Sequence, residues 1–144
     1  MPATDRILRA VKNALVKDGW TITADPLTLM YEGLNVYVDL AAERLLALEK
    51  GGERIAVEVK TFSAKSKVHE FETMLGQYVV YLTVLRKLDP DRKLFVAVGE
   101  WVYLDFLLRR GVQTVLREAG VPLIVVDLQT EEIVQWVHPT TTEP

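Results

Sequence analysis

The sequence contains no cysteine, which excludes disulfides, thiolate zinc sites, iron–sulfur clusters and a cysteine nucleophile. No apolar run approaches the roughly 20 residues that a membrane helix needs, and residues 1–10 are too polar for a secretory signal peptide. Without a glycine-rich phosphate loop, the sequence gives no support to nucleotide hydrolysis by a P-loop mechanism. We therefore expect a cytoplasmic protein with no membrane association, in which only oxygen atoms, His69 and His138 can bind a metal.

The composition is typical of one globular domain spanning residues 1–144, with 49% hydrophobic and 26% charged residues. We expect residues 139–144, which are mostly Pro and Thr, to form a frayed tail. The net charge of −3 gives no general attraction to nucleic acid. Residues 1–93 nevertheless carry 14 Lys/Arg against 13 Asp/Glu, whereas residues 94–144 carry 3 against 7, so a phosphate-binding surface belongs to the first part.

Hydrophobic periodicity predicts helices and strands in a mixed order. Apolar residues at three- and four-residue spacing favour helices over 4–17, 68–88, 101–110 and 112–118. Short apolar or alternating runs predict strands over 20–23, 27–31, 35–40, 45–50, 53–62, 93–98, 123–128 and 132–137. This order predicts an α/β fold with a central mixed β-sheet flanked by helices.

One predicted strand carries two charged residues in an apolar setting. Side chains alternate along a strand, so Glu58 and Lys60 share one face while Val57 and Val59 point into the core. The preceding Gly51-Gly52 pair predicts a tight hairpin turn. That turn would place Leu45 opposite Glu58 and Glu43 opposite Lys60, with Asp39 on the same face.

Such a cluster of carboxylates has a chemical interpretation. Acidic side chains repel one another unless a cation neutralises them, and carboxylate oxygens with water molecules are suitable ligands for Mg²⁺. A nearby lysine can stabilise charge on a phosphate, so the predicted reaction is phosphodiester hydrolysis. The alternative is that Glu58 and Lys60 lie on the solvated face of the hairpin, paired with each other or with Arg44 and Arg54.

The pattern Asp39, Glu58-Val59-Lys60 and a following helix with Gln77 and Tyr81 resembles the PD-(D/E)xK nuclease superfamily. This resemblance implies a restriction-endonuclease-like fold that binds Mg²⁺ or Mn²⁺ through Asp39 and Glu58. Lys60 would then activate water and Gln77 would orient the phosphate, with Tyr81 in a supporting role.

The chain departs from this pattern in three places. Val38 rather than proline precedes Asp39, and the first helix offers Asp5 in place of the glutamate that some members contribute. The gap of 19 residues between Asp39 and Glu58 is long. Glu43, which lies 15 residues before Glu58, is therefore a rival or supplementary ligand.

Nearly the whole chain also resembles the XisH family. The resemblance is carried by residues 10–20, 38–43, 49–52, 55–60 and 133–136. It implies a controlling factor for excision of the fdxN element, a DNA segment that a site-specific recombinase removes during heterocyst differentiation. The partners implied are DNA, a small XisI-like protein and the recombinase itself.

Two hypotheses follow for the function. The first is a metal-dependent endodeoxyribonuclease acting in programmed DNA excision, for which a homodimer is expected because cutting two strands needs two sites. The second is a non-catalytic nuclease-fold scaffold that binds DNA, XisI or the recombinase. Trp20, Trp101 and Trp136 could stack on bases, but isolated aromatics bounded by apolar runs are more often core or interface anchors, which is the role expected for them.

Overall fold

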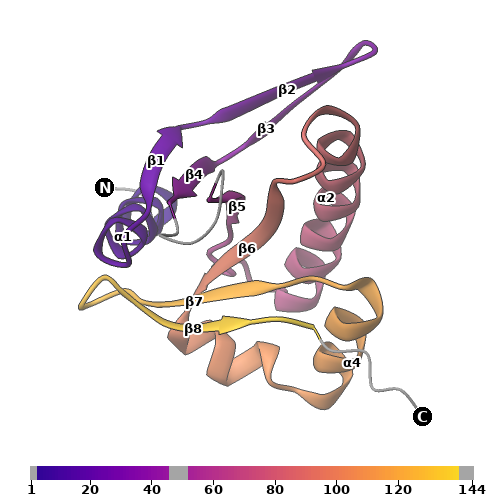
Figure 1. The fold of residues 1–144 in the computed structure, drawn as a ribbon. Helices are drawn as coiled ribbons and strands as arrows, with labels where there is room; N and C mark the ends of the chain where they lie inside the picture. The colour runs from indigo at the N-terminus through magenta and orange to yellow at the C-terminus, as the bar shows by residue number, and fades with distance from the viewer. Residues whose placement is uncertain (1–2, 46–51, 140–144) are drawn as a thin grey trace.

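The computed structural model describes residues 3–45 and 52–139, which form a sheet with helices on both of its faces (Figure 1). The strands are β1 Thr21–Ala24, β2 Leu27–Tyr31, β3 Leu34–Val38, β4 Leu40–Arg44, β5 Glu53–Val59, β6 Lys93–Gly99, β7 Leu123–Asp127 and β8 Glu132–Val137. The helices are α1 Ala3–Lys17, α2 Lys67–Leu88, α3 Glu100–Val102, the π-helical turn η1 Tyr103–Leu107 and α4 Arg110–Ala119. Within these ranges no helix is long and apolar enough to cross a membrane.

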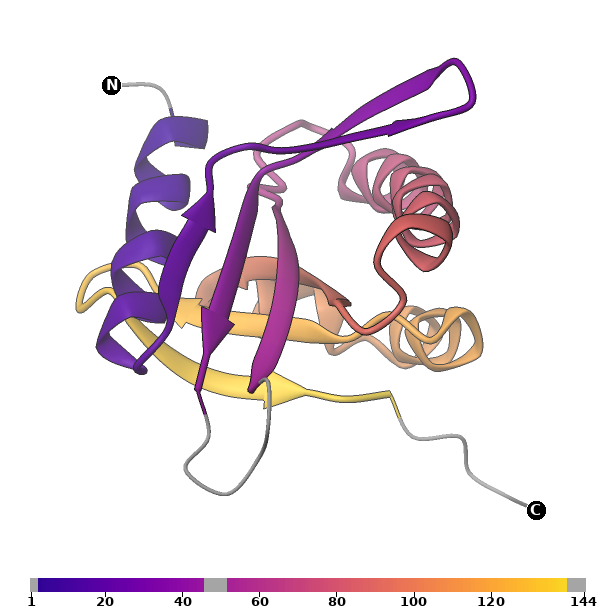
Figure 2. The same ribbon diagram turned by 45° about the horizontal axis from the view of Figure 1, so that its top comes forward.

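Among the described strands, six form a mixed sheet in the spatial order β1-β4-β5-β6-β7-β8. The central strands β5, β6 and β7 run parallel to one another, and the other neighbours are antiparallel. In Figure 2, α1 and α2 lie on opposite sides of this sheet. The predicted α/β class, with a central mixed sheet between helices, is confirmed.

Each face of the sheet has its own apolar core. On one face, Val11 and Leu15 of α1 pack in a cluster with Val57 of β5. On the other face, Met74 of α2 belongs to a second cluster that includes Ala56 of β5. Since consecutive residues of β5 serve opposite cores, the strand is buried on both sides, as expected for a parallel strand between helical layers.

Several segments differ from the elements expected from the sequence. The strand expected over 35–40 is divided at Asp39 into β3 and β4. The helix expected over 101–110 is one short α-helical stretch followed by the π-helical turn η1. Strand β4 ends at Arg44, and most of the strand expected over 45–50 lies outside the described residues, as do Gly51 and residues 140–144.

Strands β2 and β3 form a separate two-stranded sheet, called here the β2–β3 arm, which extends beyond the main sheet (Figures 1 and 2). Leu29 and Val36 on one side of the arm are buried in the α2 core. Met30 and Tyr37 on the other side are 67% and 56% exposed. The arm is therefore packed against the domain through one face and open to solvent through the other.

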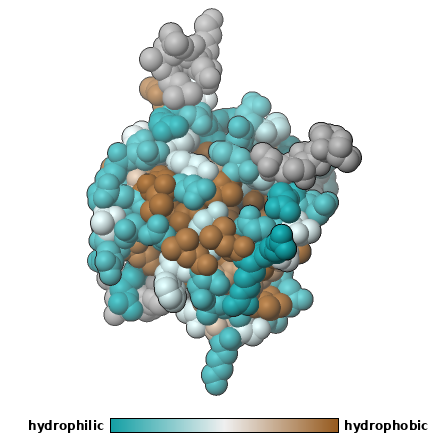
Figure 3. All heavy atoms as spheres, turned by 90° about the horizontal axis from the view of Figure 1, so that it is seen from below, coloured by the Kyte–Doolittle hydropathy of each residue, from teal (hydrophilic) through white to brown (hydrophobic). Residues whose placement is uncertain are grey.

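The surface also carries apolar side chains away from the arm. Trp101 is 74% exposed and Leu104 is 57% exposed. In Figure 3, apolar residues gather near the middle of the face seen from below, within a border of hydrophilic residues. Contiguous apolar surface of this kind is typical of contact sites for other molecules.

Gly52 and Gly33 both have positive φ angles, of 62° and 84°, but their surroundings differ. A Cβ atom at Gly52 would collide with the backbone oxygen of Arg44, whereas one at Gly33 would meet nothing within 4 Å. We expect Gly52→Ala to lower the free energy of unfolding by about 2–4 kcal/mol and Gly33→Ala by only about 1 kcal/mol. Urea unfolding measures both values, and equal losses would contradict the steric argument.

Candidate functional site

Asp39 lies at the junction between the β2–β3 arm and the main sheet. β3 ends at Val38 and pairs with β2, whereas β4 begins at Leu40 and pairs with β5. In the β4–β5 register Leu40 faces Val57, and continuing that register by one residue brings Asp39 opposite Glu58. The bend in the chain therefore places the first acid beside the second.

Reciprocal hydrogen bonds hold the two acids in place. The backbone N–H of Asp39 donates to Glu58 Oε1 at 3.2 Å. The backbone N–H of Val59 donates to Asp39 Oδ2 at 2.8 Å. Each carboxylate thus accepts a hydrogen bond from the strand that carries the other, which fixes the pair with little freedom of rotation.

Glu58 is the buried charged residue of the described chain, with only 8% of its surface exposed. It shares a face of β5 with Ala56, on the α2 side of the sheet. Burial and, second, the negative charge of Asp39 raise the pKa of Glu58 from 4.5 to about 7, although Lys60 acts in the opposite direction. Near neutral pH this carboxylate is therefore poised to exchange its proton for another positive charge.

Lys60 follows β5 and places a positive charge beside Glu58. Its Nζ atom lies 3.5 Å from Glu58 Oε2, and its side chain is 23% exposed. Its backbone N–H donates to the carbonyl oxygen of Ala97 at 3.0 Å, so the residue continues the pairing of β5 with β6. The amine is consequently anchored to the sheet while its charged end remains accessible.

One face of α2 approaches the acids. The pKa of Tyr81 is raised by burial and then by the charges of Glu58 and Asp39, which places the phenol within their electrostatic reach. Gln77 precedes Tyr81 by four residues and so shares its face of the helix. The Oε1 atom of Gln77 is buried and accepts no hydrogen bond among the described residues.

The predicted position of Glu43 is wrong. Glu43 pairs with Arg54 in the sheet rather than with Lys60, and its carboxylate lies 3.9 Å from Arg92. Leu45 likewise lies past the end of β4 instead of opposite Glu58. The cause is the connection between β4 and β5, which is longer than a tight Gly51-Gly52 turn. Four residues of strand separate Glu43 from Asp39 by about 13 Å, too far to share an ion.

The remaining sequence candidates lie elsewhere. His69 is exposed on the first turn of α2, where its backbone N–H donates to the capping Ser66 Oγ at 3.1 Å. His138 packs against Phe95, with ring centroids 5.8 Å apart. Residues 3–45 and 52–139 contain no group of three or more acidic or histidine residues arranged to hold a metal ion.

The donor set nevertheless fits a hard divalent cation. Asp39 and Glu58 offer two carboxylates at one point, and such cations accept carboxylate oxygens and complete their shell with water or phosphate oxygens. The raised pKa of Glu58 and the unpartnered oxygen of Gln77 indicate groups that a cation or its water molecules would stabilise. With such a cation bound, the two acids and the adjacent amine would be able to position a phosphate ester.

Comparisons with known proteins add a family to this geometry. A family model described as XisH protein matches residues 1–134. The chain belongs to the XisH family. No match was found among curated protein sequences.

Two crystal structures support the XisH assignment. An XisH family protein from Nostoc punctiforme is 40% identical to this chain with a TM-score of 0.85, over 93% of this chain and 100% of that one. A protein named as an fdxN element excision controlling factor, from Anabaena variabilis, is 41% identical with a TM-score of 0.83, over 93% and 99% of the two chains. The fold described above is therefore the fold of solved XisH relatives.

Proposed function

We propose that this XisH-family protein hydrolyses DNA phosphodiester bonds with a divalent cation, Mg²⁺ or Mn²⁺, bound by Asp39 and Glu58. The observation that carries the proposal is the convergence of the two acids and Lys60 at one end of β5. This arrangement also supports a relationship of the site to the PD-(D/E)xK superfamily, which has the same residue types in the same order.

The energetics of the pair favour a bound cation. Two carboxylates held in contact repel each other, and one of them is buried next to a single lysine. A second positive charge would offset both the repulsion and the loss of hydration. Carboxylates that are costly to keep together without a ligand are typical of functional sites.

The residues around the acids have distinct roles in the proposed hydrolysis. When bound, the cation supplies positive charge at a phosphate oxygen and lowers the pKa of water. Lys60 stabilises negative charge on the scissile phosphate, and Gln77 orients it through its carboxamide. The oxygen of a water molecule bonds to phosphorus as one P–O ester bond breaks, and the departing oxygen takes up a proton.

The biological setting of the proposal comes from the family. The Anabaena variabilis relative is named for control of fdxN element excision. We infer that this chain likewise takes part in programmed DNA excision, with DNA, a small XisI-like protein and a site-specific recombinase as its partners. Two copies acting together would supply one site for each strand.

Calorimetry with Mn²⁺ tests the metal site, and supercoiled plasmid tests the reaction. We expect the wild-type protein to bind Mn²⁺ and to convert plasmid to nicked or linear forms with Mg²⁺ but not with EDTA. Asp39→Ala should lose at least tenfold in Mn²⁺ affinity, because it removes one of two ligands. Equal Mn²⁺ binding by both proteins would contradict the assignment of the ligands.

A scaffold without catalysis is the second candidate function. The exposed Trp101 and the apolar area in Figure 3 favour it, because they offer contact surface for a partner. The absence of a third acid from the described part of the site favours it as well. A protein that binds DNA or XisI but leaves plasmid intact under all metal conditions would identify the scaffold.

A further inference from the structure

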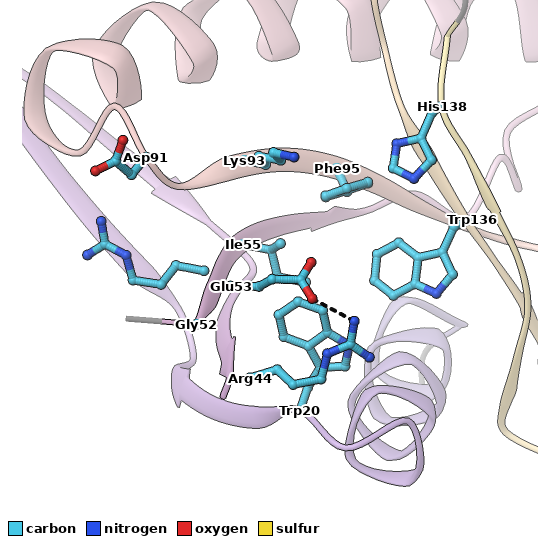
Figure 4. A pocket seen from close by; sticks show the side chains of 11 residues that line it. Trp20, Arg44, Gly52, Glu53, Ile55, Asp91, Lys93, Phe95, Trp136 and His138 are labelled. Carbon is cyan, nitrogen blue, oxygen red and sulfur yellow. Dashed lines mark hydrogen bonds and ion pairs between the residues drawn. The ribbon is translucent and has the colours of Figure 1, made fainter. Parts of the chain in front are cut away.

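A second site lies on the opposite face of the sheet from Asp39 and Glu58. It is a hollow of about 800 Å³, called here the aromatic pocket, whose walls include Trp20, Phe95 and Trp136 (Figure 4). None of the predicted catalytic residues lines it. Its volume lies within the range of about 300–1,000 Å³ that is typical of small-molecule sites.

The pocket exists because α1 covers only part of its face of the sheet. The helix ends at Lys17, and Gly19 turns the chain with a φ of 93°. Beyond the end of the helix, Ile55 of β5 and Phe95 of β6 form the wall, and they are 2% and 3% exposed. They belong to the parts of these two strands that lie farther from the candidate catalytic site. The hollow therefore has a rigid apolar floor made of sheet residues.

Aromatic rings form a continuous wall along one side. The centroids of Trp20 and Trp136 lie 5.9 Å apart, and Phe95 meets Trp136 edge to face at 5.1 Å. Phe95 and Trp20 are buried, whereas Trp136 is half-buried and His138 is exposed. Trp136 thus has ring surface left to contact a ligand, held in position by the two buried rings.

Arg44 provides a hydrogen-bond donor on the adjacent wall. Its guanidinium lies 4.5 Å from the Trp20 ring centroid and donates to Glu53 at 2.8 Å. Its Nε atom is buried and donates to no acceptor within residues 3–45 and 52–139. The side chain as a whole is 30% exposed, so the terminal nitrogens of its guanidinium can donate to a ligand in the pocket.

Lys93 supplies an available cation. Arg54, which also lines the pocket, is paired with Asp89 at 2.6 Å, but Lys93 forms no ion pair with any described residue. Figure 4 places Lys93 above Phe95, with Asp91 on the side away from Trp136. The aromatic wall therefore has near it a lysine without an ion pair to the described residues. Of the two acids that line the pocket, Glu53 is neutralised by its ion pair with Arg44, and Asp91 lies on the far side of Lys93 from Trp136.

We propose that the aromatic pocket binds a nucleotide, with the base against Trp136 and the phosphate at Lys93. Every nucleobase has a face that stacks on an aromatic side chain, and the phosphate pairs with an ammonium group. The guanidinium of Arg44, whose side chain is 30% exposed, supplies a further donor for the ligand. Nucleotide binding in this pocket does not depend on the proposed hydrolysis, because the two sites use different residues on opposite faces of the sheet.

Two ligands share this chemistry: a free mononucleotide and an unpaired nucleotide within a DNA strand. Fluorescence of the pocket tryptophans distinguishes them, in a Trp101→Phe background that removes the exposed indole. EDTA is present throughout, so that failure at the Asp39 site cannot affect the result. The probes are dTMP, thymidine, single-stranded oligo(dT) and a duplex of the same length.

We expect saturable quenching by dTMP that is at least fivefold tighter than quenching by thymidine, because only dTMP carries the phosphate. Lys93→Ala should weaken dTMP binding about fivefold and leave thymidine binding unchanged. Lys87→Ala removes another exposed lysine, which lies on α2 and does not line the pocket, and is the matched control. Quenching by dTMP alone supports the free nucleotide, and quenching by oligo(dT) as well supports the unpaired strand.

The stacking contact has its own variants, measured by equilibrium dialysis with labelled dTMP. Trp136→Leu should weaken binding about tenfold or more, whereas Trp136→Phe retains a ring and should recover much of the affinity. Thermal unfolding of both variants shows whether the fold is kept. The proposal is overturned if no nucleotide binds, if Lys93→Ala and Lys87→Ala behave alike, or if duplex binds as tightly as single strand.

Discussion

Plasmid cleavage by Glu58→Gln and by Lys60→Ala is expected to fall at least about 100-fold below the wild-type rate in Mg²⁺. Glu58→Gln keeps the shape of the side chain and its hydrogen bond from the backbone of Asp39 but removes the negative charge that binds a cation. Lys60→Ala removes the ammonium group nearest to that carboxylate. Agarose-gel assays of supercoiled DNA at several enzyme concentrations measure both effects.

Glu43→Gln is the matched control for this experiment. It removes an acid from the same strand as the candidate site, but this acid pairs with Arg92 and lies about 13 Å from Asp39 along β4. Its cleavage rate should equal that of the wild type. If Glu58→Gln and Lys60→Ala cut as fast as Glu43→Gln, the hydrolytic function is wrong and the scaffold is favoured.

The metal-free protein is expected to lose about 3 kcal/mol of stability between pH 4.5 and 7 through Glu58 alone. The folded state raises the pKa of this group from 4.5 to about 7. In this window the folded chain holds the proton and the unfolded chain has released it, so the free energy of unfolding decreases as the pH rises. Above the folded pKa the contribution of Glu58 no longer changes.

The measurement is urea unfolding in EDTA at several pH values, with the wild type compared with Glu58→Gln so that other titrating groups cancel. The wild type should become the less stable of the two as the pH approaches 8. Adding Mn²⁺ at pH 8 should restore stability to the wild type only, because the ion binds the folded state. A difference between the two proteins that does not change with pH would contradict the raised pKa.

The sequence predicts the architecture well where the pattern is long and regular. The 3.6-residue period over 68–88 gives α2 to within one residue, and the apolar runs at 93–98 and 123–128 give two parallel strands. Such segments are predictable because their burial follows from the residues themselves. The apolar spacing over 101–110 predicts an α-helix and does not distinguish the π-helical turn η1, whose Phe106 and Leu107 are buried in the α2 core.

The candidate site shows where local reasoning fails. The alternation of side chains correctly places Asp39, Glu58 and Lys60 on one side of the sheet, because that depends only on parity. The pairing of Glu43 with Lys60 failed because it depends on the length of the β4–β5 connection. The break at Asp39 and the hydrogen bond from Val59 are tertiary features, which no pattern within a single segment encodes.

The junction at Asp39 also bears on how the protein can change over evolution. Pairing with β2 holds the chain on one side of this residue, and pairing with β5 holds it on the other. Residues inserted at the tip of the β2–β3 arm, between Tyr31 and Leu34, would lengthen the arm without displacing the acid. Such insertions would therefore change the reach and chemistry of this projection while leaving Asp39 beside Glu58 at its base.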